Sequence, residues 1–236
     1  MILAALAALG ASSAGEALFR DDPKAAFRLA RESERPLLIE FHTTWCEACE
    51  KMQRSTWRDG GVLTLIDDFV ALSVDGDRNA NLVSRYDVKG YPTIVLAEPG
   101  GEPILVLLGY QDAGTLRGQL GAVLGNWDEL RALAVEAVGG RSEATALVGL
   151  GDFALAGGAH VHAEQCYRRA LRQGKALPDD LLLRARVGLI EVLAATDRCR
   201  EAVRILKRAK PVHVDDLAAR TEQVFREPGG SCRQQP

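Results

Sequence analysis

Two cysteines separated by two residues form the most reactive pair that the sequence offers. They lie in the segment Trp45-Cys46-Glu47-Ala48-Cys49, directly after an apolar run and at the predicted start of a helix. Cysteines three positions apart on a first helical turn can close a small disulfide ring, and the positive end of the helix dipole stabilises a thiolate on the first one. We therefore expect Cys46 to be a redox-active nucleophile and Cys49 to be the resolving thiol.

A carboxylate in the preceding apolar run fits the same chemistry. Glu40 lies six positions before Cys46 and has Ile39 and Phe41 as its neighbours. Burial raises the pKa of a carboxyl group toward the range that is useful for proton transfer. We expect Glu40 to be buried and to accept a proton from Cys49, the alternative being a carboxylate at a strand edge in water.

A second candidate region begins a later strand, at Gly90-Tyr91-Pro92-Thr93. A proline at the first residue of a strand and after an aromatic residue is a candidate for a cis peptide bond. The residues alone are compatible with either isomer.

Up to residue 125, short apolar runs alternate with helical patterns, which predicts an α/β layer. A turn cluster at residues 98–102 favours a hairpin between the last two strands. We therefore predict a mixed sheet with helices on both faces. The expected strands are residues 36–42, 70–75, 93–96 and 104–108, and the expected helices are 22–35, one from Cys46, 79–86 and 114–124.

After residue 125 every strong pattern is helical, and a degenerate repeat with an offset of 39 residues is present. It resembles tetratricopeptide repeats, in which small residues let paired helices approach closely. Ile190 departs from the small residue expected at its position, and a generic helical bundle is the alternative. Further helices are expected at 127–138 and 214–226. The aligned residues are Leu150, Gly151, Ala163, Tyr167 and Ala170 with Leu189, Ile190, Ala202, Leu206 and Ala209.

The strand, the WCxxC motif and the Gly-x-Pro-Thr loop together resemble the thioredoxin superfamily over roughly residues 19–124. The stretches EFHTTWCEACEKMQRSTW, DGGV and VDGDRNANLVSRYDVKGYPT are similar to the thioredoxin-like domain that terminates DsbD-type transmembrane reductases and to its free-standing relatives. The resemblance implies a thioredoxin fold and thiol-disulfide exchange with protein substrates, resupplied with electrons by a reductase. It implies no organic cofactor and no metal.

The resemblance also assigns roles to single residues. Cys46 attacks a substrate disulfide, Cys49 resolves the mixed disulfide, and Glu40 takes the place of the buried acid. Pro92 takes the place of the cis-proline beside the cysteines, and the backbone at Tyr91 pairs with an extended substrate chain. Trp45, Tyr91 and Pro92 are thus the expected substrate-binding residues.

Two departures from thioredoxin itself argue for a different member of the superfamily. Glu-Ala stands between the cysteines in place of Gly-Pro, and Ala71 falls where thioredoxin has a strand lysine near its buried acid. Carboxylates at Glu47 and Glu50 disfavour the Cys46 thiolate and push the couple toward the reducing side. We predict a reductant or isomerase rather than a strong oxidant.

Length and charge limit the remaining choices. The 236 residues suit one large or two small domains, and the formal charge of -3 provides no global basic field for nucleic acid. Residues 1–125 carry a net charge of -5 and the remainder +2. We predict a thioredoxin-like domain at 15–125, a helical tetratricopeptide-like domain at 126–228 and a flexible tail at 229–236. No segment reaches the length of an integral membrane span.

Residues 1–14 resemble a short secretory signal, with an apolar stretch and small residues that suit cleavage after Ala14. This favours a periplasmic or otherwise exported protein. The stretch lacks a basic start, so a buried helix or a start codon placed too far downstream is the alternative, and a cytoplasmic location follows if the segment is not cleaved.

The other cysteines and histidines are interpreted as structural. A zinc site at the CxxC would need a second pair of ligands, whereas Cys166, Cys199 and Cys232 are scattered singly. We expect Cys166 and Cys199 to be buried as small apolar groups, although an exported protein allows one disulfide among Cys166, Cys199 and Cys232. His160 and His162 diverge on a helix and are expected at surface or cap positions, without a metal.

A basic run at residues 198–210 lacks interleaved aromatics and is interpreted as a solvated helix face. The sequence thus predicts a thiol-disulfide oxidoreductase whose helical region docks a protein partner. The alternatives are an interaction or scaffold protein in which the CxxC is a structural disulfide, and a cytoplasmic redox or holdase factor.

Overall fold

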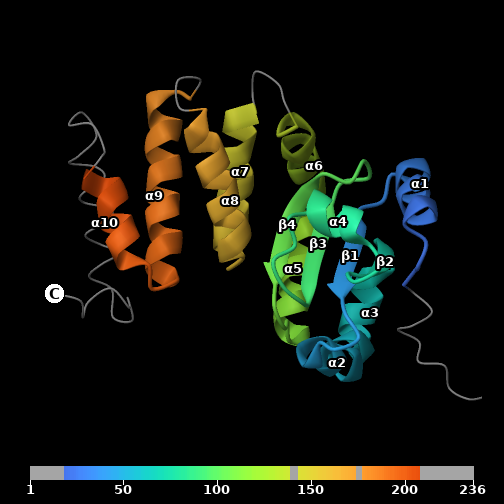
Figure 1. The fold of residues 1–236 in the computed structure, drawn as a ribbon. Coiled ribbons are helices and arrows are strands. Elements are labelled where there is room, and N and C mark those ends of the chain that lie inside the picture. The colour runs from blue at the N-terminus through green and yellow to red at the C-terminus, as the bar shows by residue number, and fades with distance from the viewer. Residues whose placement is uncertain (1–18, 139–142, 174–176, 208–236) are drawn as a thin grey trace, which may run out of the picture.

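The computed structural model describes residues 19–138, 143–173 and 177–207 (Figure 1). The predicted signal segment 1–14, the predicted helix 214–226, the tail 229–236 and the residues Ala209 and Cys232 lie outside the described residues. Within the described part, an α/β region is followed by helices alone, as the sequence predicts.

A four-stranded mixed sheet forms the centre of the first region. Its strands are β1 (Leu37–His42), β2 (Val70–Asp75), β3 (Thr93–Ala97) and β4 (Pro103–Leu108), in the order β2-β1-β3-β4. β1 pairs with β2 in parallel, and the other two pairs are antiparallel. The predicted strands and the β3–β4 hairpin are confirmed.

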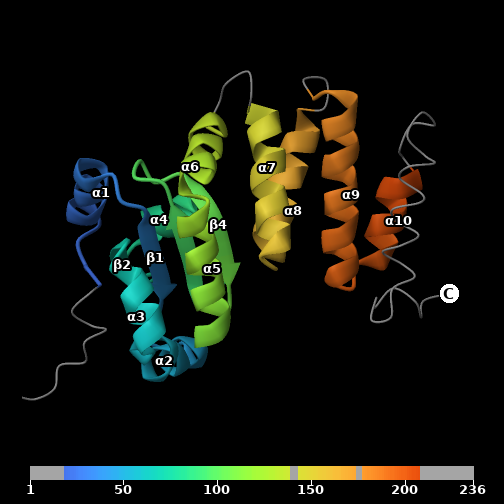
Figure 2. The same cartoon turned by 180° about the vertical axis from the view of Figure 1, so that it is seen from behind.

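Helices cover both faces of this sheet. α1 (Pro23–Ser33) and α4 (Ala80–Arg85) cover one face, while α2 (Glu47–Arg54), α3 (Gly60–Ile66) and α5 (Ala113–Gly125) cover the other (Figures 1 and 2). This arrangement is the thioredoxin fold. A short 3-10 helix, η1, spans Thr56–Arg58.

The two-residue period of β1 decides what each face of the sheet carries. Leu37, Ile39 and Phe41 pack under α1 and α4, whereas Leu38 packs with Met52 of α2. Glu40 shares the face of Leu38 because side chains two apart on a strand point the same way. Its carboxyl group is therefore directed at the layer that holds α2.

Helix α3 is not among the helices that the sequence pattern predicts. Two adjacent glycines open it, and glycine is about 1 kcal/mol less favourable than alanine in a helix. The side chain of Asp59 compensates as an N-cap, accepting a hydrogen bond from the backbone N–H of Val62 at 2.9 Å.

The second region consists of helices in series. They are α6 (Trp127–Glu136), α7 (Glu143–Ala156), α8 (His160–Arg172), α9 (Asp179–Ala195) and α10 (Cys199–Lys207). Each helix from α7 onward packs on the next, so the series extends sideways from the sheet (Figure 1).

Tyr167 of α8 is the central side chain of this helical series. It is fully buried, and a Cβ added at Gly151 of α7 or at Gly188 of α9 would lie 2.7 or 2.3 Å from its ring. The repeat alignment places a small residue at Gly151, which is a site of close approach, and the second such site, Gly188, lies two positions before the aligned Ile190. The tetratricopeptide-like character of the series stays a prediction.

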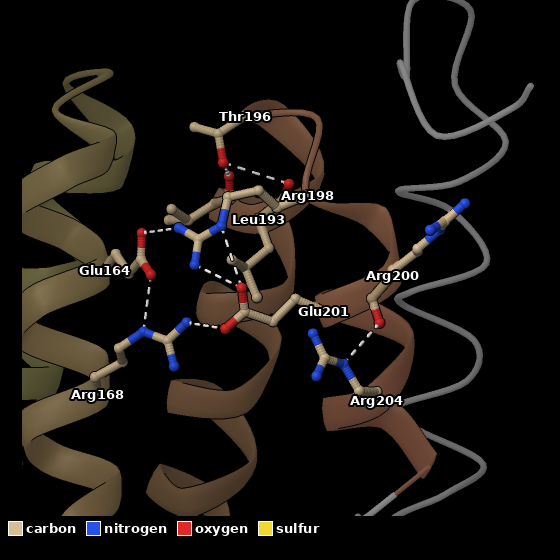
Figure 3. A network of polar contacts seen from close by, with 9 residues as sticks. Glu164, Arg168, Leu193, Thr196, Arg198, Arg200, Glu201 and Arg204 are labelled. Carbon is tan, nitrogen blue, oxygen red and sulfur yellow. Dashed lines mark hydrogen bonds and ion pairs between the residues drawn. The ribbon is translucent and has the colours of Figure 1, made fainter. Parts of the chain in front are cut away.

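Ion pairs join the start of α10 to α8 (Figure 3). Arg198 contacts Glu164 at 2.6 Å and Glu201 at 2.5 Å, and Arg168 contacts Glu164 at 2.8 Å and also Glu201. These opposite charges hold the pKa of Glu201 below its usual range. Part of the basic run is therefore paired, while Arg200 and Arg204 are exposed as expected.

The two regions share one continuous hydrophobic cluster, in which α6, α7 and α8 pack against β4. Side-chain contacts add to it: the Gln119 amide donates to the carbonyl of Gly157 at 3.0 Å, and Arg131 lies 3.5 Å from Glu34. The helices therefore cover the β4 side of the sheet and leave α2 uncovered (Figure 2). In the described part of the chain, no helix combines the length and apolar character needed to cross a membrane.

Candidate active site

The cysteine pair lies where β1 ends and α2 begins. Cys46 is the N-cap of α2, with extended backbone angles, and the first helical residue is Glu47. A disulfide joins Cys46 to Cys49, whose Cα atoms are 5.2 Å apart. The Cys46 sulfur also accepts a hydrogen bond from the Cys49 backbone N–H at 3.1 Å. This donor and the helix dipole would both stabilise negative charge on Cys46.

The two sulfurs differ in their surroundings. Cys46 is 9% exposed and Cys49 3%, and Cys49 lies on the same buried face of α2 as Met52. A group that arrives from solvent therefore reaches the outer thiol first. This asymmetry is what an attacking and a resolving thiol require.

Glu40 is fully buried, which confirms the sequence prediction. Its carboxyl group accepts a hydrogen bond from the Trp57 indole N–H at 2.6 Å, and the Gln53 amide lies at 3.4 Å. Burial raises its pKa to about 7, against the lowering effect of hydrogen bonds from Trp57 and Ser73. A carboxyl group with this pKa gains and loses a proton near neutral pH.

One sequence assignment beside Glu40 is wrong. The register of β1 and β2 pairs Glu40 with Ser73 and pairs Ala71 with Leu38. The position next to the buried acid is therefore Ser73, not Ala71. Ser73 carries a hydroxyl in place of the thioredoxin lysine. The prediction that no cation lies beside the buried acid therefore applies to Ser73 instead of Ala71.

The loop before β3 lies at the same end of the sheet. Thr93 pairs with Phe41, so Pro92 is adjacent to the loop that leads from β1 to Cys46. The peptide bond between Tyr91 and Pro92 is cis. The ring of Tyr91 meets that of Trp45 edge to face, with 5.8 Å between centroids.

Trp45 presents an exposed aromatic surface beside the disulfide. It is 66% exposed, and its indole N–H donates to the Asp77 carboxylate at 3.0 Å. Tyr91 is seated over Gly76, where an added Cβ would lie 2.1 Å from the phenol oxygen. Sequence reasoning missed Asp77 and Gly76, and only their place just after β2 could have indicated them.

The expectation for His162 is wrong, because this residue is buried rather than at a surface or cap. Burial lowers its pKa to about 4, and its Nε2 lies 3.5 Å from the Cys166 sulfur. Cys166 is a free, buried thiol whose pKa burial raises to about 12. Cys199 is buried and disulfide-bonded. Among the described residues, no group of three or more His, Cys, Asp or Glu side chains could hold a metal ion.

The family model described as Thioredoxin-like matches residues 19–99. A thiol:disulfide interchange protein DsbD from Vibrio vulnificus (strain CMCP6) is 31% identical over 80 residues, which are 32% of this chain and 14% of that protein. A thioredoxin from Alicyclobacillus acidocaldarius subsp. acidocaldarius is 29% identical over 100 residues, which are 42% of this chain and 92% of that protein. The chain thus spans about one seventh of the DsbD relative.

The solution structure of a thioredoxin from Thermus thermophilus aligns with a TM-score of 0.43 and 28% identity, covering 46% of this chain and 89% of that chain.

Proposed function

Residues 19–99 form a thioredoxin-like domain, and from this premise we propose that the protein exchanges thiols and disulfides with protein substrates through Cys46 and Cys49. The main supporting observation is the position of Cys46 as the N-cap of α2, beside the exposed Trp45. There its sulfur accepts a hydrogen bond from the Cys49 backbone N–H. A structural disulfide needs neither the helix terminus nor an exposed aromatic neighbour.

The first step forms a mixed disulfide. In the reduced protein the Cys46 thiolate attacks one sulfur of a substrate disulfide, and the other substrate sulfur leaves as a thiolate. The Cys49 N–H and the positive end of α2 stabilise the Cys46 thiolate before the attack. The substrate bond breaks as the new sulfur–sulfur bond forms, so electrons balance within this step.

The second step releases the substrate. Cys49 loses its proton and attacks the Cys46 sulfur, which forms the disulfide seen here and expels the substrate cysteine as a thiolate. Glu40 is the proposed proton acceptor, because it faces the layer that holds α2 and has a pKa of about 7. Trp57 and Gln53 hold its carboxyl group in place.

Substrate binding is assigned to the surface around the disulfide. Trp45 supplies exposed apolar area, and Tyr91 and Pro92 border the same end of the sheet. An extended substrate chain would pair with the backbone at Tyr91, as the thioredoxin resemblance implies.

The proposed direction is reducing or isomerising. Glu47 and Glu50 occupy the first turn of α2, where their charge opposes a thiolate on Cys46. Each turnover in the reducing direction leaves the Cys46–Cys49 disulfide, so a second protein with a reduced dithiol must supply two electrons. That reductase is the proposed electron-donor partner.

The helical region is proposed to dock a protein partner. Support comes from the series α7 to α10, which leaves α2 uncovered, and from the turn between α7 and α8, which lies toward the same end of the molecule as α2 (Figures 1 and 2). An exported location is proposed from the signal-like residues 1–14. Fractionation with N-terminal sequencing of the mature protein tests it.

The central test combines a redox titration with trapping. The reduction potential of the Cys46–Cys49 pair is measured against glutathione, and a Cys49→Ser variant is used to capture mixed disulfides. We expect a potential between about -120 and -270 mV and captured proteins bound through Cys46. A potential below about -300 mV with no capture would support a structural disulfide and the scaffold alternative.

A further inference from the structure

An open cavity of about 360 Å³ lies directly beside the disulfide. Both cysteines line it. The remaining wall comes from the end of β1, the loop that follows and the outer side of α2: His42, Thr43, Thr44, Trp45, Glu47, Glu50 and Gln53.

Two carboxylates line this cavity. Glu47 and Glu50 supply carboxylates, and Glu50 is paired with the exposed Arg54. Among the described residues Glu47 takes part in no ion pair. Lys51 turns away from the cavity, because its ammonium lies 4.0 Å from the centre of the Tyr110 ring. The cavity therefore carries the negative charge of Glu47, which pairs with no cation in the described part of the chain.

A buried hydroxyl provides an independent indication of a ligand. Thr43 is 3% exposed and lines the cavity, yet its Oγ1 has no hydrogen-bond partner. A buried hydroxyl without a partner costs roughly 1 to 3 kcal/mol. A donor group that enters the cavity would satisfy it.

We propose that this cavity binds the Lys or Arg side chain of a residue next to the reactive cysteine of the substrate. The inference rests on the proposed function and names its substrate class: disulfides flanked by a basic residue. An ammonium or guanidinium group supplies only donors, which matches Glu47, Glu50 and the Thr43 hydroxyl.

The distances along a polypeptide make this arrangement feasible. A substrate cysteine joined to Cys46 places its neighbouring residue about 3.5 Å farther along an extended chain. Cys46 itself lines the cavity, so the side chain of that neighbour starts at the cavity mouth. A basic residue several positions away would lie outside it.

The test uses reduced full-length protein and peptides that each carry one cysteine as a mixed disulfide with a chromophoric thiol. Four peptides differ only in placing Lys, Gln or Glu next to the cysteine, or Lys four residues away. The rate constant of thiol release is measured for the wild type, for Glu47→Gln and Thr43→Val, and for the control Glu32→Gln on α1. Glu32 is exposed and lies on the opposite face of the sheet from α2.

The readout is the ratio of rates for the Lys and Glu peptides within each variant, so a general change in Cys46 reactivity cancels. We expect a two- to fivefold preference for adjacent Lys, since an exposed ion pair contributes up to about a fivefold effect. Glu47→Gln should abolish most of the preference and Thr43→Val should reduce it, whereas Glu32→Gln should retain it.

Two outcomes would overturn the inference while leaving the exchange function intact: a ratio unchanged by Glu47→Gln, or an equal preference for Lys placed four residues away, which indicates long-range attraction only. Absence of thiol release from every peptide would instead refute the proposed function.

Discussion

Replacement of Glu40 by glutamine tests whether burial raises the pKa of the Glu40 carboxyl group. The carboxyl group has a pKa of about 7 in the folded chain and 4.5 as its ordinary value. A group whose pKa is higher in the folded state binds its proton more tightly there. Its contribution to stability is therefore complete below pH 4.5 and is lost as the pH rises through 7. Glutamine keeps the shape and an oxygen for the Trp57 N–H but removes this titration.

The magnitude follows from the two pKa values. One pKa unit corresponds to 1.36 kcal/mol, so the wild type should lose about 3 kcal/mol of stability relative to Glu40→Gln between pH 4 and pH 8. Most of this change arises from burial, because the carboxyl group is fully enclosed.

The measurement is urea unfolding of the oxidised proteins in half-unit steps over this pH range. Oxidation keeps Cys46 and Cys49 from titrating. The exposed carboxylate Glu32 provides a control as Glu32→Gln, which removes only a solvent-exposed ion pair worth at most about 1 kcal/mol. A constant difference for Glu40→Gln would refute the assignment of a protonated, buried Glu40.

Other substitutions give separate expectations. Trp57→Phe removes the strongest hydrogen bond to the Glu40 carboxylate, so the pKa of Glu40 should rise further and the inflection in the pH dependence of exchange should move to higher pH. Gly188→Ala places a methyl group 2.3 Å from the Tyr167 ring and should cost about 1 to 3 kcal/mol in urea unfolding, whereas a loss below 0.5 kcal/mol would contradict the close packing. Glu201→Gln weakens the ion pairs between α8 and α10 and should lower stability by no more than about 1 kcal/mol. The same change should raise the rate of amide hydrogen exchange in α10. Unchanged hydrogen exchange would mean that packing alone holds this helix.

Much of the α/β region follows from local pattern. The apolar runs that became β1 and β3 are short and bounded by turn residues, and the helix after Cys46 follows from its position after a strand. The helix α3 was missed because Gly60 and Gly61 weaken its pattern, and its N-cap by Asp59 is a contact that the sequence does not display.

For the site, too, some features were predictable from the sequence and others were not. The cysteine pair and buried Glu40 were predictable, since both depend on residue type and on strand neighbours. The partner of Glu40 on β2 depends on strand register, and a shift of two residues separates Ala71 from Ser73. The indole of Trp57 reaches Glu40 across 17 positions through packing, so no local pattern could have indicated it.

His162 shows why a helical position is a weak guide to burial. Its place in the first turn of α8 suggested a cap, yet α8 packs on α7, α9 and β4, so little of the helix surface is left for solvent. The environment of the His162 imidazole is therefore set by tertiary contacts of α8, including those with β4 of the α/β region, and not by its position along the helix.

The covering of β4 by α6, α7 and α8 also determines how the molecule meets other chains. An outer strand with free N–H and C=O groups invites pairing with a strand from another molecule, which leads to aggregation or domain swapping. Here helices pack against β4, and the segment around Arg20 bridges β2 on the opposite side. Both lateral routes of sheet extension are therefore obstructed. The proposed main-chain pairing of a substrate with the loop before β3 would therefore not compete with pairing at either edge of the sheet.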